Sequence, residues 1–74
     1  MKTKYYYDIH IDYEGRGYSI CVSTQKKLTD DEIINLIPQN KFEEEKDREL
    51  IDSIEEITKQ EAFEWYSKNR IIKL

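Results

Sequence analysis

Cysteine, proline and glycine are scarce in this chain of 74 residues, which contains one, one and two of them. The single cysteine, Cys21, excludes an intramolecular disulfide, and no zinc motif can be drawn around it. This cysteine usage fits a reducing compartment. Both glycines lie in the run Glu14-Gly15-Arg16-Gly17, which lacks the Lys and the Ser or Thr of a phosphate-binding loop. That run predicts a turn.

Long apolar runs are also absent. The longest are pairs such as Ile33-Ile34, so we expect no membrane-spanning segment and no membrane partner. The opening residues 1–8 lack the apolar segment of a secretory signal. We therefore expect a cytoplasmic protein. A chain of this length makes one domain, so residues 1–74 are expected to form a single domain.

Positive charge is deficient in the middle of the chain. The formal net charge is −4, but thirteen acidic and only four basic residues lie between Asp30 and Glu64. Both ends carry a small excess of positive charge. This distribution argues against direct nucleic-acid binding and against anionic membranes. It suits a protein partner with a basic surface, or solubility alone.

Alternating side chains at the start of the chain predict a β-hairpin. Apolar and aromatic residues alternate with polar ones along residues 5–13 and again along residues 18–25, which is the period of a half-buried strand. Gly15-Arg16 could form a two-residue type II′ turn, or residues 14–17 could form the loop. Either turn is expected to place Tyr13 opposite Tyr18 and His10 opposite Cys21. We expect one apolar core face and one solvated polar face.

Two capping boxes predict two short helices. Thr29 with Glu32, and Thr58 with Glu61, have the spacing at which the threonine and the glutamate each accept from the other's backbone N–H. The first helix must stop before Pro38, and its expected buried stripe is Ile33, Leu36 and Ile37. The second is expected to run to about Asn69. Its expected inward side chains are Ala62, Trp65 and Tyr66, with Phe63 beside them.

Residues 42–57 allow two interpretations. The apolar positions between Leu50 and Ile57 fall within one helical arc, which favours a helix. The N-cap of a new helix at Thr58 argues instead that the preceding chain is not helical. We favour a strand from about Glu49 to Ile57 after an acidic loop. The alternative is a hairpin packed on three helices. Residues 71–74 could add a short strand. The expected fold is α+β, in the order ββαβα, with both helices on one face of the sheet.

Four residues of the hairpin could carry chemistry. Asp8, His10 and Asp12 share one strand face, and Cys21 is expected opposite His10. Two carboxylates, an imidazole and a thiol suggest a metal site or a Cys–His nucleophile pair. A flat strand face rarely closes a shell around an ion, and no orienting group is evident. We therefore predict no metal, no cofactor and no catalytic residue, and keep a small metal-binding or enzymatic protein as the alternative.

Tyr6 is expected to point to the solvated face, where a tyrosine among polar residues can anchor an interface. Aromatic residues on a sheet face can also stack nucleic-acid bases. Such binders interleave Lys or Arg with the rings, whereas Asp8 and Asp12 occupy those places here. Tyr6 is accordingly predicted to contact a protein partner.

The sequence as a whole resembles the small acidic accessory proteins of phages and mobile elements. The features that carry the likeness are a tyrosine-rich hairpin followed by Leu28-Thr29-Asp30-Asp31-Glu32 and Ile57-Thr58-Lys59-Gln60-Glu61, in a Lys- and Ile-rich, Ala-poor composition. Some members of that group, including the anti-CRISPR proteins, inhibit host defence nucleases. The resemblance implies no functional residue.

The expected function is non-catalytic protein binding, through which an acidic surface inhibits a host protein that binds nucleic acid or acts in defence. A homodimer, formed at the exposed hairpin edge or near Trp65, is the third alternative. The residues predicted to bind the partner are Glu43, Glu44, Glu45, Asp47, Glu49, Glu55, Glu56 and Tyr6.

Overall fold

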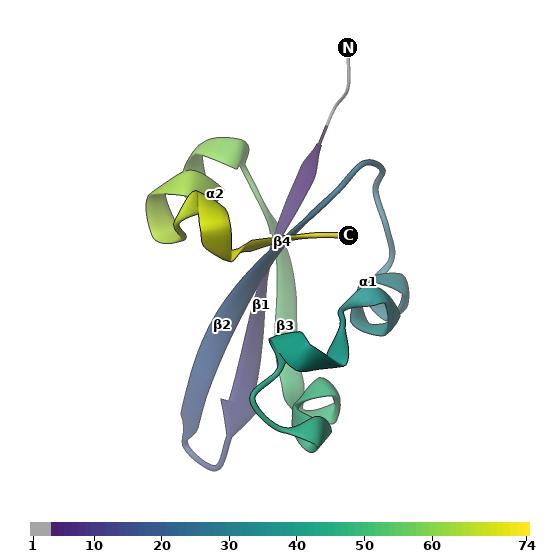
Figure 1. The fold of residues 1–74 in the computed structure, drawn as a ribbon, viewed down its shortest axis with the longest axis vertical. Helices are drawn as coiled ribbons and strands as arrows, with labels where there is room; N and C mark the ends of the chain where they lie inside the picture. Colours follow the sequence, from purple (N-terminus) through teal and green to yellow (C-terminus); the bar gives the residue numbers. More distant parts are fainter. Residues whose placement is uncertain (1–3) are drawn as a thin grey trace.

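The computed structural model describes residues 4–74 as an elongated domain measuring 41 × 24 × 19 Å (Figure 1). The expectation of no signal segment falls partly on residues 1–3, outside this range. The described elements follow one another in this order: β1 (Tyr5–Tyr13), β2 (Arg16–Thr24), α1 (Asp30–Leu36), η1 (Gln39–Lys41), η2 (Glu45–Leu50), β3 (Ile51–Ile57), α2 (Lys59–Trp65), η3 (Lys68–Arg70) and β4 (Ile71–Lys73). The segments η1 to η3 are short 3₁₀ helices.

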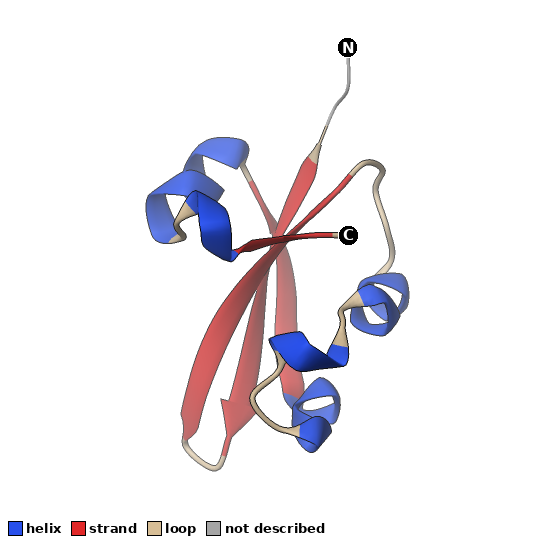
Figure 2. Cartoon of the chain, in the orientation of Figure 1, coloured by secondary structure: helices blue, strands red, loops and turns tan. Residues whose placement is uncertain are grey.

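The strands form one mixed sheet in the order β3-β1-β2-β4 (Figure 2). β1 pairs antiparallel with β2 and with β3, and the short β4 runs parallel to β2. The α+β class, the hairpin and the strand before Thr58 are therefore confirmed, and β4 is the terminal strand. β3 pairs with β1 from Tyr6 to Ile11, whereas β4 pairs with β2 only from Cys21 to Ser23. The outer edge of β2 from Arg16 to Ile20 therefore has no strand partner among the described residues, and the dimer contact at an exposed hairpin edge stays a prediction.

The hairpin turn is centred on Glu14 and Gly15, whose φ angles are +48° and +78°. Two central residues with positive φ make a type I′ turn, which matches the twist of the strands. The predicted turn at Gly15-Arg16 and the predicted register are wrong. Tyr13 pairs with Arg16, and Ile11 with Tyr18. The shift is two residues, so each side chain keeps its face of the sheet.

Gly17 explains why the second strand passes so close to the first. A Cβ atom at this position would lie 2.6 Å from the backbone oxygen of Ile11. Real Cβ atoms do not approach a backbone oxygen this closely, so any side chain here would push the two strands apart. Gly17 therefore fixes the spacing of the hairpin beside its turn.

Both predicted capping boxes are present. Thr29 Oγ1 accepts from the Glu32 N–H and Thr58 Oγ1 accepts from the Glu61 N–H, and each glutamate accepts from the threonine N–H in return. α1 ends at Leu36, before Pro38, whereas α2 ends at Trp65 rather than near Asn69. Within residues 4–74, no helix has the length and apolar character that crossing a membrane requires.

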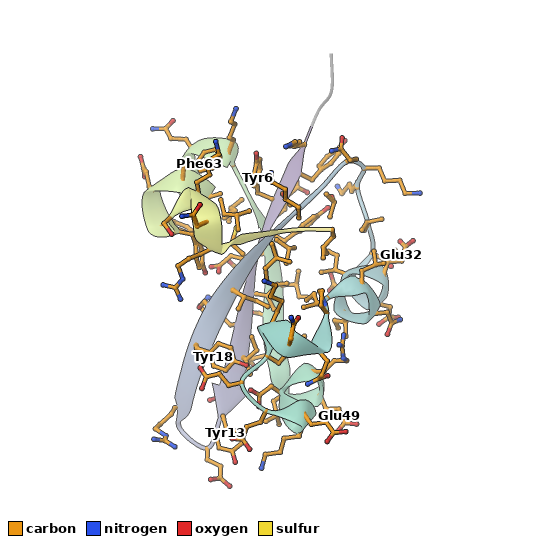
Figure 3. The ribbon with its side chains drawn as sticks, in the orientation of Figure 1. Tyr6, Tyr13, Tyr18, Glu32, Glu49 and Phe63 are labelled. Atoms are coloured by element: carbon orange, nitrogen blue, oxygen red, sulfur yellow. The ribbon has the colours of Figure 1, made fainter. Side chains whose placement is uncertain are left out.

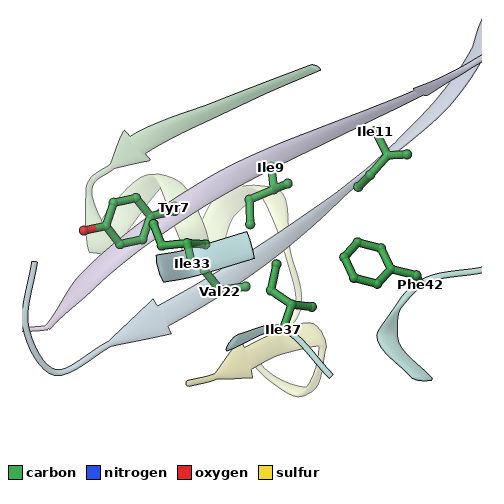
Figure 4. Close-up of a cluster of buried hydrophobic side chains, with 7 residues drawn as sticks. All are labelled: Tyr7, Ile9, Ile11, Val22, Ile33, Ile37 and Phe42. Atoms are coloured by element: carbon green, nitrogen blue, oxygen red, sulfur yellow. The ribbon is translucent and has the colours of Figure 1, made fainter. Parts of the chain in front are cut away.

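The larger core lies on the face predicted to be apolar. The buried side chains of β1 and β2 on this face meet Ile33, Ile37 and Phe42, which follow one another along α1 and the segment after it (Figure 4). The strand residues of this cluster are Tyr7, Ile9, Ile11 and Val22. Leu36 is 53% exposed, so its predicted place in the buried stripe is wrong. The seven-residue helix turns it away from the sheet.

The second face of the sheet is also covered. Tyr6 and Cys21 are buried against Ile57 and Ala62, and Tyr66 packs beside them. The two helices therefore lie on opposite faces of the sheet, so the prediction that both cover one face is wrong. Trp65, predicted to point inward, is 54% exposed.

The turn generates a first prediction. Glu14 adopts a left-handed backbone conformation, which costs a residue with an ordinary side chain about 1–2 kcal/mol and costs asparagine less. Glu14→Asn is therefore expected to raise the free energy of unfolding by about 0.5–1 kcal/mol, measured by urea denaturation. Glu14→Val is the control and should lower it. An unchanged or lower value for Glu14→Asn would show that this turn is not strained.

Candidate functional site

A hollow of about 260 Å³ opens between the hairpin tip and the segment that leads into η2. We call it the acidic hollow. Figure 3 shows Tyr13 and Tyr18 at this end of the molecule, far from Tyr6 and Phe63. The side chains and backbone that line the hollow belong to Tyr13, Arg16, Gly17, Tyr18, Glu43, Glu44 and Asp47.

Asp47 forms the floor of this site. Its side chain is only 2% exposed, and its Oδ2 accepts from the Tyr18 hydroxyl at 2.6 Å and from the Glu44 N–H at 3.0 Å. The other oxygen, Oδ1, is buried and accepts no hydrogen bond from the described residues. No ion pair joins Asp47 to a cation in the described part of the chain. A buried carboxylate with an unused oxygen is costly, so such groups commonly have a functional explanation.

Tyr18 connects β2 to residues 43–49, which we call the acidic segment. Its hydroxyl donates to Asp47 and accepts from the Glu43 N–H at 3.1 Å. Burial, and then the hydrogen bond to Asp47, raise the pKa of Tyr18 from 10.0 to about 12. Tyr18 therefore stays a neutral donor at physiological pH. This contact joins residues 29 positions apart in the chain, so no local sequence signal could have revealed it.

Arg48 holds the acidic segment against α1. Its guanidinium donates to the backbone oxygens of Ile34 and Ile37, the latter at 2.7 Å. Arg48 also lies over the Phe42 ring, 4.9 Å from its centroid. The last carbonyls of a helix have no N–H partner within the helix, and at the end of α1 the charged guanidinium of Arg48 supplies the missing donors. Because Arg48 is one residue from Asp47, this contact also positions the hollow.

Two local cations lie at the mouth of the hollow. Arg16 lines it, and Lys46 lies over the Tyr13 ring, with its Nζ 4.4 Å from the centroid. Contact with Tyr13 raises the pKa of Lys46, which is fully exposed. The rim is therefore of mixed charge, whereas the floor at Asp47 is acidic.

The predicted partner-binding residues separate into three groups. Glu43, Glu44, Glu45 and Glu49 are exposed, whereas Asp47 is buried. Glu43 and Glu44 line the acidic hollow, and Glu45 and Glu49 line a separate hollow with Lys46 and Arg48. Asp47 is therefore not an exposed side chain of the acidic surface, because Tyr18 and the Glu44 backbone cover it, and its contact with a partner stays a prediction.

Glu55 and Glu56 lie elsewhere, on the outer strand β3. As neighbours on a strand they point to opposite faces, and Glu56 pairs with Lys27 at 3.7 Å. Tyr6 is 5% exposed, so the prediction of a solvent-facing anchor is wrong. α2 covers the face of the sheet to which Tyr6 belongs, and the alternation of side chains along the strand could not reveal this contact.

The four residues considered for metal binding do not form a ligand set. Asp8 is buried and accepts a hydrogen bond from the Tyr66 hydroxyl, and Cys21 is fully buried opposite Asp8 rather than His10. Asp12 lies exposed opposite Gly17. Within residues 4–74, no three His, Cys, Asp or Glu side chains are grouped so that they could hold a metal ion.

Ser19, His10 and Asp8 instead form a polar row across β1 and β2. Ser19 Oγ lies 3.0 Å from His10 Nδ1, and His10 Nε2 lies 3.3 Å from Asp8 Oδ2. A hydroxyl, an imidazole and a carboxylate in this order resemble a nucleophilic triad, which also needs free donors for an oxyanion. His10 lies in the middle of the sheet, where it pairs with Ser19 of β2 on one side and with Ser53 of β3 on the other. Its backbone therefore belongs to two strand pairings and is not a free donor for an oxyanion. We interpret the row as polar contacts between strands.

The Tyr18–Asp47 contact generates a second prediction. Tyr18→Phe removes the donor to a buried carboxylate, and we expect it to lower the free energy of unfolding by about 1–3 kcal/mol. Urea denaturation followed by circular dichroism measures this loss. Tyr5→Phe is the matched control, because Tyr5 is a half-buried tyrosine of β1 on the same face of the sheet. Equal losses in the two variants would contradict a specific role for Tyr18.

The same contact should depend on pH. The pKa of Tyr18 is about 12 in the folded protein, above its ordinary value of 10.0, so the folded state holds this proton more tightly. Its contribution to stability is complete below about pH 10 and is lost as the pH rises through about 12. The difference in stability between the wild type and Tyr18→Phe should therefore shrink over this range. A constant difference would contradict the assignment.

Cys21 generates a third prediction. Burial, and then the neighbouring Asp8 carboxylate, raise the pKa of the Cys21 thiol from 9.0 to about 11. The thiolate is the reactive form, so its population near neutral pH falls about 100-fold. A thiol-specific disulfide reagent should therefore modify native Cys21 at least that much more slowly than the urea-unfolded chain. Equal rates would show that α2 does not cover this face.

Comparison with known proteins does not assign this chain to a family. The chain matches no family model, and it shows no significant similarity to a curated protein sequence or to a solved structure. The function must therefore be argued from the residues themselves, and the acidic hollow with Asp47 at its floor is the site with the most developed chemistry.

Proposed function

We propose that this chain is a non-catalytic protein-binding module, and that its acidic hollow receives a basic side chain of the partner protein. The partner's surrounding basic surface would lie against Glu43, Glu45 and Glu49. The observation that carries the proposal is a buried carboxylate, that of Asp47, which lines a hollow with aromatic walls and whose Oδ1 accepts no hydrogen bond from the described residues.

The charge at Asp47 supports a cationic ligand. Burying a carboxylate costs free energy unless a cation or several donors compensate it, and here two donors reach one oxygen only. A cation that enters the hollow would be attracted both by this carboxylate and by the glutamates at the rim. The field of these groups would also speed the encounter with a basic surface.

Arginine fits the walls better than lysine does. A guanidinium is planar, can lie against aromatic rings and donates several hydrogen bonds in fixed directions. The hollow offers the rings of Tyr13 and Tyr18 together with the carboxylates of Glu43 and Glu44. A volume of about 260 Å³ is sufficient for one such side chain and insufficient for a large organic ligand.

A basic surface with an exposed arginine is typical of proteins that bind nucleic acid. We therefore propose that the chain inhibits such a protein, in a host, by occupying that surface. This agrees with the resemblance to accessory proteins of phages and mobile elements.

The fourth prediction concerns the rim. Glu43, Glu45 and Glu49 are replaced together by glutamine, while Glu44 is kept because it caps η2. An arginine-rich peptide serves as the probe, titrated into the isotope-labelled protein and followed by NMR. We expect the triple variant to bind about 10-fold more weakly at low salt, and the difference to shrink at high salt. In the wild type, the amides of Tyr18 and Glu44 should shift.

The control removes three exposed charges elsewhere, by Asp30→Asn, Asp31→Asn and Glu64→Gln. Its affinity should stay close to that of the wild type. Arg16→Gln should strengthen binding, because it removes a competing cation from the rim. Equal losses in the rim variant and the control, or weaker binding by Arg16→Gln, would overturn the proposal. A pull-down from host lysate that compares wild type with the rim variant would then identify the partner.

A further inference from the structure

A second hollow, of about 650 Å³, lies at the other end of the sheet. We call it the basic hollow. It is lined by Lys4, Tyr6, Lys59, Phe63 and Lys68, which come from the start of β1, from α2 and from η3. Figure 3 shows Tyr6 and Phe63 together at this end, away from Tyr13 and Tyr18. Three ammonium groups and two aromatic rings thus line this hollow, and no acidic residue of the described range 4–74 lines it.

Phe63 presents an aromatic surface in this hollow. Its side chain is 43% exposed, and its ring meets the buried Tyr6 ring edge to face, with centroids 5.9 Å apart and planes at 62°. This contact holds the Phe63 ring in place. The Lys59 Nζ lies over the same ring, 5.9 Å from its centroid. A cation and an exposed ring are therefore side by side.

The acidic residues of α2 are engaged elsewhere. Glu61 accepts from the Thr58 N–H at 3.0 Å in the capping box, and Glu64 accepts from the Gln60 side chain at 3.2 Å. Neither lines the basic hollow. The three lysines are therefore free of a carboxylate within the hollow itself, and their charge is available to an anionic ligand.

We propose that the basic hollow binds single-stranded nucleic acid, with one base against the Phe63 ring and the flanking phosphates at Lys59, Lys68 and Lys4. Stacking on an aromatic ring beside basic side chains is how proteins hold single strands without reading their sequence. Duplexes are disfavoured, because their bases are already stacked and cannot reach the ring. An acidic peptide would satisfy the lysines but would leave the aromatic face unused.

This inference goes beyond the proposed function and runs against the expectation, drawn from the overall charge, of no direct nucleic-acid contact. The structure gives the reason for the difference. Glu43 and Glu44 line a hollow with Tyr13 and Arg16 at the hairpin tip, and Figure 3 shows Tyr13 and Glu49 at the end away from Tyr6 and Phe63. The molecule is 41 Å long. Beyond about 8 Å, charges are largely screened at physiological ionic strength. The basic hollow can therefore attract an anion although the whole chain is negative.

The test uses a fluorescein-labelled oligothymidylate of about ten nucleotides, followed by anisotropy. We expect measurable binding at about 50 mM salt and an affinity about 20-fold lower at 200 mM, as three phosphate contacts predict. Phe63→Ala should weaken binding about 5- to 150-fold through loss of stacking. The double variant Lys59→Gln with Lys68→Gln should reduce the slope of log affinity against log salt by about 1.4.

Matched controls separate the site from the surface in general. Trp65→Ala removes an exposed aromatic residue of the same helix that does not line the hollow, and Lys41→Gln removes a distant cation. Both should bind as the wild type does. Absence of binding at low salt, or equal losses in Phe63→Ala and Trp65→Ala, would overturn the proposal. Binding of a poly-glutamate peptide with the same affinity would overturn it in favour of an acidic protein segment. The rim variant of the acidic hollow should leave oligonucleotide binding intact, so the two proposals can fail separately.

Discussion

The first half of β1, from Tyr6 to Ile9, is buried on both faces, and this constraint organises the rest of the structure. Tyr7, Ile9 and Ile11 point into the larger core, while Tyr6 and Asp8 point under α2. A strand in this position must be central, because its backbone groups and both rows of side chains need partners. β2 and β3 supply the backbone partners, and one α-helix lies over each face. In a small domain, covering both faces of the sheet is an efficient way to bury enough apolar surface.

This arrangement separates the molecule into two chemically different ends. The hairpin tip carries the acidic segment and the hollow over Asp47, whereas the start of β1 meets α2 and η3 in a hollow lined by lysines. The average charge of the chain conceals this polarity. A small protein can therefore offer one surface to a basic protein and another to a polyanion without either charge cancelling the other, because screening limits their mutual influence.

The α+β class, the hairpin, β3 and both helix starts could be predicted from the sequence, because each depends on neighbouring residues. Alternation of side chains marks β1 and β2. The spacing of Thr58 and Glu61 marks a helix start, and that start in turn favours a strand before it, although the apolar positions of β3 follow a helical arc. The sequence also indicated the acidic residues 43–49, of which Glu43, Glu44 and Asp47 line the acidic hollow, and their contact with a partner stays a prediction. The hairpin register was less predictable, because two pairs of residues could occupy the centre of the turn. The structure has Glu14 and Gly15 there, whereas the sequence suggested Gly15 and Arg16.

The sequence by itself determined which segments form the hairpin and where the two α-helices begin, because hydrogen bonds between near neighbours and the period of the side chains act locally. Only the tertiary structure decided which face each helix covers, and so whether Tyr6 and Cys21 are exposed or buried. It alone paired Tyr18 with Asp47, 29 positions later, and brought Lys4 beside Lys59 and Lys68. Both sites consist of contacts between distant segments. Such contacts depend on how the chain closes around the sheet, and that physical outcome leaves no periodic mark in the sequence.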